Sequence, residues 1–553
     1  MTSNTAIYFA TEAFTTAGKA RLMGRHAAGE GFLKALARHG TSGEMCCFAA
    51  GQRDARAFAE LLKSWGCDKP VRWVPHAQAG GLKEVGGLFV PGPDLGEMAW
   101  QRRRLGNGLY SISGVTHTIS SHKAMDAIAD LLVAPVAPWD ALVCTSRAVA
   151  DAAQRLLALE AAYLKERLGA ATPPSPTLAL IPLGVDCAAL APGDAGRAAW
   201  RARLGIGADD VAFLFFGRLS YHAKANPLPM YLALERAAQA SGRRIHLVQA
   251  GWFANEAIER EFRQGAAALC PSVNAIFLDG REEEVRGGAW HAADAFVSLS
   301  DNIQETFGLT PVEAMAAGLP CVVSDWDGYR DTVRDGVDGF CIPTVMPPPG
   351  LGADLAARHE DGLDSYDRYI GHASLFVGVD VAAASEACTR LAADADLRRR
   401  MGAAARERAL AEFDWLPIVR RYESLWAGLA ERRGKGPASD PALPGLAHPR
   451  RCDPYWLFSG YPTQSVGPQS RLTLEAGAAP GQLRALGGSG LVNFGMELLP
   501  PWEELEEAVR RVAAEPGLNT QRLLEAFPAE SRPRLWRGLS WLAKLGLLRI
   551  SGN

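Results

Sequence analysis

The sequence lacks several features that would assign it to a class of protein at once. It has no run of about 18 apolar residues, so we expect no membrane-spanning helix. The first residues, MTSNTAIYFATEAF, have neither a basic start nor a long apolar stretch, and we therefore expect no signal peptide. The net charge is only −3, so overall charge does not indicate a nucleic acid or an anionic membrane as the partner.

Cysteine is present, but not in the patterns of cross-linked or zinc-binding proteins. None of the ten cysteines belongs to a C-x-x-C pair, and several lie in apolar runs. This favours reduced, buried thiols over a disulfide framework or a zinc site. We therefore expect a cytoplasmic protein, with peripheral contact at the inner face of the membrane left open.

Short apolar runs alternate with amphipathic helical stretches in two successive series. The first series includes strand candidates at 6–10, 44–51 and 141–146. The second contains five continuous apolar runs, at 211–217, 245–251, 275–280, 295–300 and 320–325. Such alternation predicts parallel sheets covered by helices on both faces.

Pro and Gly collect in LIPLGVDCAALAPGD (180–194), which separates the two series. We therefore predict an α/β protein with two doubly wound, Rossmann-like domains, at 1–190 and 191–433. A linker rich in Pro, Gly and Ser follows at 434–450. The remaining part, 451–553, is predicted to be a small, mainly helical domain.

The C-terminal domain has three helical units, at 503–517, 519–528 and 534–550, the last running into a short strand. This pattern resembles a winged-helix module. Residues 501–553 carry eight Lys or Arg and seven Asp or Glu, a net charge of +1. DNA binding needs a basic face, so an interaction or homo-oligomerisation module is favoured and no nucleic-acid partner is expected.

The most informative stretch is DNIQETFGLTPVEAMAAGLPCVVSDWDG (301–328). It is predicted to run from a strand through a loop into a helix and back to a strand. Thr310 as N-cap, Pro311 at the first helical position and Glu313 at the third predict a capping box. Capping alone is one interpretation of Glu313. The other is a ligand contact, because a helix N-terminus at the carboxyl edge of a parallel sheet attracts phosphate.

Two cations follow a predicted buried strand in FFGRLSYHAKANPLPM (215–230). Arg218 offers a planar fork of donors and Lys224 a point charge, a combination that suits a diphosphate. The alternative is a pair of solvated surface cations.

These motifs occur together and in order. Arg218 with Lys224, then Glu305 and Glu313 around FGLT, then GLPCVVSDWDG resemble the donor site of retaining GT-B glycosyltransferases of the family 4 type. LVCTSRAVAD (142–151) and IPLGVD (181–186) resemble further segments of that family. The resemblance extends over about residues 5–430 and is strong in 211–341.

The resemblance implies a role for each residue. Arg218 and Lys224 would hold the donor diphosphate, and the Gly308–Leu309–Thr310 backbone would add N–H donors. Glu313 would accept hydrogen bonds from ribose hydroxyls, and Glu305 would face the hydroxyls of the donor sugar. The first domain would contribute a histidine to the donor sugar, either His117 or His122, of which His117 is preferred.

The predicted function is transfer of a sugar from a nucleoside-diphosphate donor to a carbohydrate or lipid-linked acceptor, with retention of anomeric configuration. Two D-x-D patterns, 325–327 and 394–396, are interpreted as structural, so neither a metal nor another cofactor is expected. Alternatives are an epimerase or phosphorylase of the same fold, and a catalytically silent sugar-nucleotide-binding protein.

Three further segments each allow two interpretations. The glycine-rich stretch 15–31 either touches the diphosphate or acceptor or is a simple strand–helix turn. The predicted insertion 345–376 either shapes acceptor choice near the cleft or is a surface excursion. Arg102–Arg103–Arg104 beside Trp100 either contacts an anionic acceptor or membrane surface or forms a solvated face, which is favoured.

Overall fold

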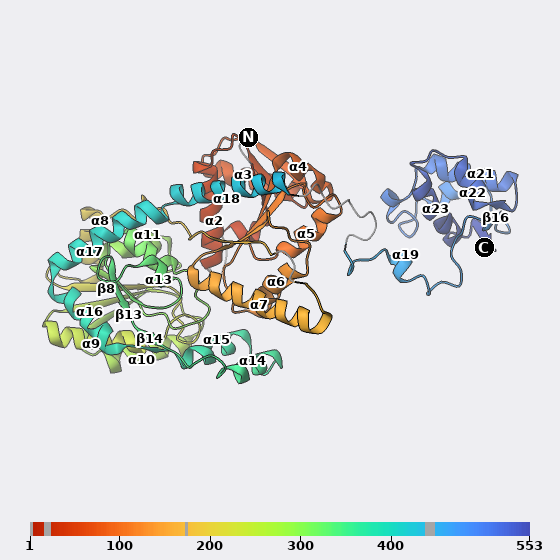
Figure 1. Ribbon diagram of the computed structural model, residues 1–553. Coiled ribbons are helices and arrows are strands. Elements are labelled where there is room, and N and C mark those ends of the chain that lie inside the picture. Colours follow the sequence, from red (N-terminus) through yellow and green to blue (C-terminus); the bar gives the residue numbers. More distant parts are fainter. Residues whose placement is uncertain (1–3, 16–23, 172–174, 437–447, 553) are drawn as a thin grey trace. The chain divides into compact units, whose positions relative to one another are not determined.

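The computed structural model describes residues 4–15, 24–171, 175–436 and 448–552. The chain divides into two compact units between residues 447 and 448 (Figure 1). The first unit holds two α/β domains and the second a small helical domain. The predicted fold class is thereby confirmed.

The first domain is built on a seven-stranded parallel sheet in the order β3-β2-β1-β4-β5-β6-β7. Its strands are β1 (Ala6–Tyr8), β2 (Met45–Ala49), β3 (Val71–Pro75), β4 (Gly87–Val90), β5 (Ser111–Val115), β6 (Ala141–Cys144) and β7 (Thr177–Leu180). The central strands are fully buried because helices cover both faces, which explains their continuous apolar sequences.

The helices of this domain connect successive strands. They are α1 (Thr11–Phe14), α2 (Gly24–His39), α3 (Gln52–Ser64), α4 (Leu82–Val85), α5 (Leu95–Arg103), α6 (His122–Ala129) and α7 (Arg147–Leu168). Ser121 caps α6 and Ser146 caps α7, each by accepting a hydrogen bond from a first-turn backbone N–H. Both helices therefore begin directly after the loops at the carboxyl ends of β5 and β6.

The second domain repeats this topology with a six-stranded parallel sheet in the order β10-β9-β8-β11-β12-β13. Its strands are β8 (Val211–Phe216), β9 (Ile245–Gly251), β10 (Val273–Asp279), β11 (Ala295–Ser298), β12 (Cys321–Ser324) and β13 (Gly339–Ile342). The order reverses between β8 and β11. In doubly wound sheets this switch point leaves a crevice at the carboxyl ends of the strands, where ligands bind.

The helices of the second domain pack on both faces of its sheet. They are α8 (Asp194–Leu204), α9 (Leu228–Ser241), α10 (Glu256–Leu269), α11 (Glu283–Ala292), α12 (Leu309–Ala316), α13 (Tyr329–Thr332), α16 (Val381–Ala393) and α17 (Ala395–Arg408). An insertion between β13 and α16 holds α14 (Ala353–Glu360) and α15 (Tyr366–Leu375), framed by the short pair β14 (Thr344–Val345) and β15 (Gly378–Val379). The predicted insertion 345–376 is thus an ordered helical hairpin.

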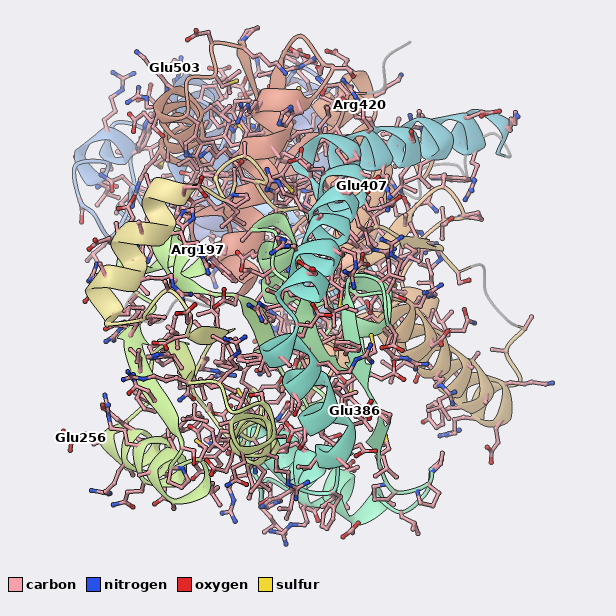
Figure 2. The ribbon with its side chains drawn as sticks, turned by 90° about the vertical axis from the view of Figure 1, so that its left-hand side faces the viewer. Arg197, Glu256, Glu386, Glu407, Arg420 and Glu503 are labelled. Carbon is pink, nitrogen blue, oxygen red and sulfur yellow. The ribbon has the colours of Figure 1, made fainter. Side chains whose placement is uncertain are left out.

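The last helix of the first unit, α18 (Trp415–Lys435), returns to the first domain. Figure 2 shows Glu407 on α17 and Arg420 on α18, where the chain passes from one domain to the other. The indole of Trp426 donates to Ser113 Oγ of β5 at 3.0 Å, and Tyr422 lies in the core beneath the first sheet. Although 191–433 was assigned to the second domain, this helix completes the core of the first.

The second unit combines helices with a small antiparallel sheet in the order β17-β16-β18. Its elements are α19 (Pro454–Leu457), β16 (Arg471–Leu474), α20 (Gln482–Leu486), α21 (Trp502–Ala514), β17 (Leu518–Asn519), α22 (Thr520–Glu525), α23 (Arg532–Lys544) and β18 (Leu548–Ser551). The three predicted helical units correspond to α21, α22 and α23, which share one leucine-rich core. Of the predicted linker, residues 437–447 lie outside the described residues.

Two expectations from composition can be compared with the structure. None of the ten cysteines, all of which are described, forms a disulfide, and most are buried. Throughout the described ranges, every helix is too short or too polar to cross a lipid bilayer.

For Arg102, both interpretations of the arginine triplet, an anionic contact surface and a solvated face, are wrong. Its side chain is 0% exposed and forms a two-pronged ion pair with Asp140, at 2.6 and 2.7 Å. Asp140 also accepts the backbone N–H groups of Ile112 and Ala137, each at 2.8 Å. Arg102 therefore links α5 to β5 and to the residues before β6, a partnership across 38 positions that the triplet itself does not indicate.

Candidate functional site

The candidate site lies at the switch point of the second sheet. Two connections leave the carboxyl ends of the neighbouring strands there: residues 217–227 after β8, called the β8 loop, and residues 299–308 after β11, called the β11 loop. The predicted cations lie on the β8 loop, and Glu305 lies on the β11 loop. Parallel pairing of β8 with β11 brings these two loops together.

Lys224 and Glu305 form an ion pair that joins the two loops. Their side chains are 21% and 14% exposed. Burial disfavours the charged form of Lys224, but the Glu305 carboxylate raises its pKa above the ordinary value. Burial would likewise raise the pKa of Glu305, but Lys224 and the N–H groups of Thr306 and Gly308 hold it below its usual range. Both groups are therefore ionised at neutral pH.

Arg218 lies half-buried beside this pair and is held by two acceptors. One terminal nitrogen of its guanidinium donates to the Ala223 carbonyl and to Gln304 Oε1, both at 2.6 Å. Burial lowers the pKa of Arg218, and the nearby Asp367 acts against that shift. The guanidinium stays protonated at any accessible pH, so two cations converge at the carboxyl ends of β8 and β11.

The predicted capping box at the start of α12 is wrong. The N-cap is Gly308, at φ +84°, and no side chain caps the helix. A Cβ on Gly308 would lie 2.1 Å from Cε1 of Tyr329, so only glycine fits this left-handed turn. The ring of Tyr329, from the following strand–helix connection, therefore limits the N-cap to glycine, and α12 begins two residues before the predicted start.

Without a capping role, polar groups at the start of α12 are left without partners. Thr310 Oγ1 is buried and has no hydrogen-bond partner. The Glu313 carboxyl makes no hydrogen bond within the described residues, and burial raises its pKa to about 7. Thr310 Oγ1 and the partly exposed Glu313 carboxyl are therefore available to a polar ligand at this helix N-terminus.

The predicted backbone donors divide into two groups. The N–H of Gly308 donates to Glu305 Oε1 at 3.2 Å, so it holds the carboxylate. The N–H groups of Leu309 and Thr310 belong to the first helical turn, where no intrahelical acceptor exists. The latter two are the donors placed to meet an anion.

Asp327 is a functional candidate that the sequence analysis interpreted as structural. It is the sole non-glycine residue with positive φ, +49°, among those described, and its Oδ2 is buried without a partner. Burial raises its pKa well above the ordinary value, and the Glu305 charge raises it further. A Cβ on the adjacent Gly328 would meet the Phe307 backbone at 2.4 Å, which places this turn directly against the β11 loop. In the sequence, the D-x-D pattern at 325–327 was the feature that could have indicated Asp327 as a functional candidate.

The two candidate histidines occupy different environments on the β5 loop, residues 116–121, and at the start of α6. The carbonyl of His117 accepts a hydrogen bond from Thr306 Oγ1 at 2.5 Å, so His117 adjoins the β11 loop. His122 is exposed, and its ring lies 3.9 Å from that of His359 in the insertion. Of the two, His117 is therefore the one in contact with the loop that carries Glu305.

The second D-x-D pattern is part of a helix start. Asp394 caps α17 by accepting the Leu397 N–H, and Asp396 pairs with Arg399. Within the described ranges, no group of three or more His, Cys, Asp or Glu side chains is arranged to hold a metal ion. The predicted absence of a metal requirement stays a prediction. Of the glycine-rich stretch 15–31, residues 16–23 lie outside the described residues.

Comparison with known proteins relates this site to one family. Residues 196–348 match the family model described as Glycosyl transferases group 1. The chain is 36% identical over 202 residues to a D-inositol 3-phosphate glycosyltransferase of Geodermatophilus obscurus, covering 36% of this chain and 42% of that protein. It is 32% identical over 219 residues to the protein of the same name from Streptomyces griseus, covering 38% and 46%. The chain thus spans less than half the length of these curated relatives.

Solved structures with low sequence identity align over most of the chain. Anabaena HepE, in complex with UDP and glucose, is 14% identical, with a TM-score of 0.48, covering 77% of this chain and 100% of that one. The sucrose-phosphate synthase of Thermosynechococcus elongatus is 18% identical, with a TM-score of 0.47, covering 78% and 100%.

Proposed function

We propose that the protein transfers a sugar from a nucleoside-diphosphate donor to an acceptor hydroxyl. The observation that carries the proposal is the convergence of Arg218, the Lys224–Glu305 pair and the unpartnered start of α12 at the switch point of the second sheet. The match of residues 196–348 to the group 1 glycosyl transferases supports it, because that stretch contains all three elements.

The two cations would bind the diphosphate and stabilise it as a leaving group. Negative charge accumulates on the diphosphate when its bond to the anomeric carbon breaks. Arg218 is already oriented by Gln304 and the Ala223 carbonyl, so it needs no rearrangement to meet that charge. The N–H groups of Leu309 and Thr310 would add to the same cradle through the N-terminus of α12.

The carboxyl groups would orient the rest of the donor. Glu313 lies in the first turns of α12 with no protein partner, so it can accept hydrogen bonds from the ribose hydroxyls. Glu305 is fixed between Lys224 and two backbone N–H groups, and in the proposed complex its carboxylate would face the donor sugar. His117 would approach the sugar from the first domain, next to Thr306.

We further propose that the anomeric configuration is retained. Retention can proceed through a covalent glycosyl-enzyme intermediate or through departure and attack on the same face of the sugar. Glu305 is engaged on both oxygens by Lys224, Thr306 and Gly308, so it is not free to act as the nucleophile, and the proposed route is the same-face one. Proton nuclear magnetic resonance of the first-formed product tests it, and an inverted anomeric signal would overturn it.

A donor screen with the purified full chain tests the proposed reaction. UDP-, GDP- and ADP-sugars are each incubated with carbohydrate and lipid-linked acceptors, and release of the nucleoside diphosphate is followed together with the sugar product. We expect release from one donor class and appearance of a glycosylated acceptor.

Other outcomes identify the competing activities. Conversion of the donor to an isomeric donor without an acceptor would indicate an epimerase, and sugar 1-phosphate formation from a glycan and phosphate would indicate a phosphorylase. Tight nucleotide binding without turnover would indicate a silent binding protein. Arg281→Ala is a matched control for the Arg218→Ala variant, because Arg281 also follows a strand of this sheet but pairs with Asp279 at the surface.

A further inference from the structure

The insertion between β13 and α16 folds into a helical hairpin, formed by α14 and α15 and called the hairpin below (Figure 1). No residue of α14 is buried, so the hairpin has little apolar core of its own. The carboxylate of Asp364, in the turn between the helices, is 1% exposed and binds Arg358 at 2.8 Å and His372 at 3.1 Å. Polar contacts therefore hold the two helices in one arrangement.

The hairpin is packed onto the candidate site. Asn302 of the β11 loop donates to the His222 carbonyl of the β8 loop at 2.9 Å and to the Ile370 carbonyl of α15 at 3.5 Å. A Cβ on Gly371 would lie 3.1 Å from Cβ of His222. The helix α15 thus lies directly against both the β8 loop, which carries Arg218 and Lys224, and the β11 loop, which carries Glu305.

Besides His359, which lies against His122, Tyr366 of the hairpin also reaches the first domain. The hydroxyl of Tyr366 lies 2.9 Å from Ser120 Oγ and 3.5 Å from Thr118 Oγ1, both on the β5 loop. It lies 3.1 Å from Gln304 Nε2, which donates to it. A single hydroxyl therefore joins the first domain, the hairpin and the β11 loop.

Gln304 links Tyr366 to Arg218, because its amide contacts both side chains. Since the amide nitrogen of Gln304 donates to Tyr366, its Oε1 faces the guanidinium and accepts a hydrogen bond at 2.6 Å. The reversed amide would place two donors face to face at Arg218. Without Tyr366, no other described side chain fixes the amide nitrogen of Gln304.

We propose that Tyr366 is a positioning residue for diphosphate binding, acting through Gln304 on Arg218 and held in place by Ser120 of the opposite domain. The inference rests on the proposed function, because it assigns the diphosphate to Arg218. Through the hairpin, the orientation of Arg218 for diphosphate binding would therefore depend on contact between the two domains. Tyr366 would not touch the donor itself.

The test compares two tyrosine-to-phenylalanine variants of the same helix. Tyr366→Phe removes the bridging hydroxyl. Tyr369→Phe is the matched control, because Tyr369 stacks on His359 at 4.8 Å but its hydroxyl makes no hydrogen bond within the described residues. Binding of UDP, GDP, ADP, inorganic pyrophosphate and the three parent nucleosides is measured by calorimetry on the full chain.

We expect Tyr366→Phe to weaken binding of the preferred nucleoside diphosphate and of pyrophosphate by about fivefold, the effect of one lost hydrogen bond. Affinity for the parent nucleoside should not change, because only the phosphate end depends on Arg218. Ser120→Ala should act in the same direction, and the double variant should be weaker than wild type by less than the product of the two single effects. Tyr369→Phe should bind as wild type does.

Two results would overturn the inference in different ways. If wild type binds the diphosphate and Tyr366→Phe binds it as tightly as Tyr369→Phe, the positioning role is wrong and the proposed function stands. If wild type binds neither pyrophosphate nor any of the three nucleoside diphosphates, the proposed function fails and the inference with it. A loss that is equal for nucleoside and pyrophosphate would show a general structural effect and would also contradict positioning.

Discussion

Each of the two domains contains an internal ion pair, and the two pairs differ in what surrounds them. Arg102 and Asp140 are both 0% exposed. The Asp140 carboxylate accepts hydrogen bonds from the Arg102 guanidinium and from two backbone N–H groups. Lys224 and Glu305 are 21% and 14% exposed and lie beside the unpartnered Thr310 Oγ1. The first pair is enclosed, although Arg102 Nε and the neighbouring Tyr110 hydroxyl lack hydrogen-bond partners there, whereas the second pair is partly exposed.

The difference separates a structural ion pair from a binding site. An enclosed pair has no direction in which a ligand could approach, so its charges serve the packing of α5 against β5. Lys224 and Glu305, which are partly exposed at the switch point, can still act electrostatically on a ligand in the crevice. Charge alone does not distinguish the two pairs, and unpartnered buried atoms occur near both, but exposure toward the crevice does.

The largest effect is expected from breaking the enclosed pair. Asp140→Asn leaves the Arg102 charge buried without a counter-charge, which should reduce the free energy of unfolding by about 3–5 kcal/mol. Urea denaturation followed by tryptophan fluorescence measures it. Arg263→Ala is the control, because its pair with Glu259 lies on the surface of α10 and should contribute about 0.5 kcal/mol or less. A small effect of Asp140→Asn would contradict the structural role of the pair.

The next largest effect concerns the open pair. Lys224→Ala should lower the transfer rate by about 10²–10³, as expected when one preorganised group that stabilises a leaving group is lost. Steady-state release of the nucleoside diphosphate measures it. Because the pair is partly exposed, the variant should lose less stability than Asp140→Asn. Transfer within tenfold of wild type, with the Arg281→Ala control also active, would remove Lys224 from the proposed mechanism.

A smaller effect should appear in the pH dependence of binding. The pKa of Glu313 is raised to about 7 by burial, so the carboxyl is protonated below that pH and ionised above it. The ionised form is the better acceptor for ribose hydroxyls, so nucleoside-diphosphate affinity should rise as the pH increases from 6 to 8. Calorimetric titration across this range measures it.

The control ligand for this experiment is the 2′,3′-dideoxynucleoside diphosphate, which has the same phosphates and lacks both hydroxyls. The difference in affinity between the two ligands should grow with pH in wild type and stay constant in Glu313→Gln. A difference that does not change with pH in wild type would assign Glu313 a role other than ribose binding.

The smallest effect on transfer is expected from removing the second unit. Truncation after residue 436 keeps both α/β domains and α18, so donor turnover should stay within about twofold of wild type. Light scattering should show a lower oligomeric state if the second unit mediates self-association, as its nearly balanced charge suggests. Unchanged oligomeric state would contradict that role, and lost transfer would place part of the site in the second unit.

The sequence by itself determined the two parallel sheets and the loops that carry the candidate ligands. Continuous apolar runs at β8, β11 and β12 marked buried strands, and such strands must alternate with helices. Residues at the carboxyl ends of neighbouring parallel strands then share one edge of the sheet. For that reason the sequence alone predicts that one site contains Arg218, Lys224 and Glu305.

Only the tertiary structure decided the environments that depend on distant partners. Gly308 caps α12 because the Tyr329 ring occupies the space of a side chain, which local capping preferences cannot show. Arg102 is enclosed because Asp140 meets it from 38 positions away. Tyr366 reaches Ser120 across 246 positions. Periodicity reports which face of an element is buried, whereas the partner of a polar group depends on how separate elements pack.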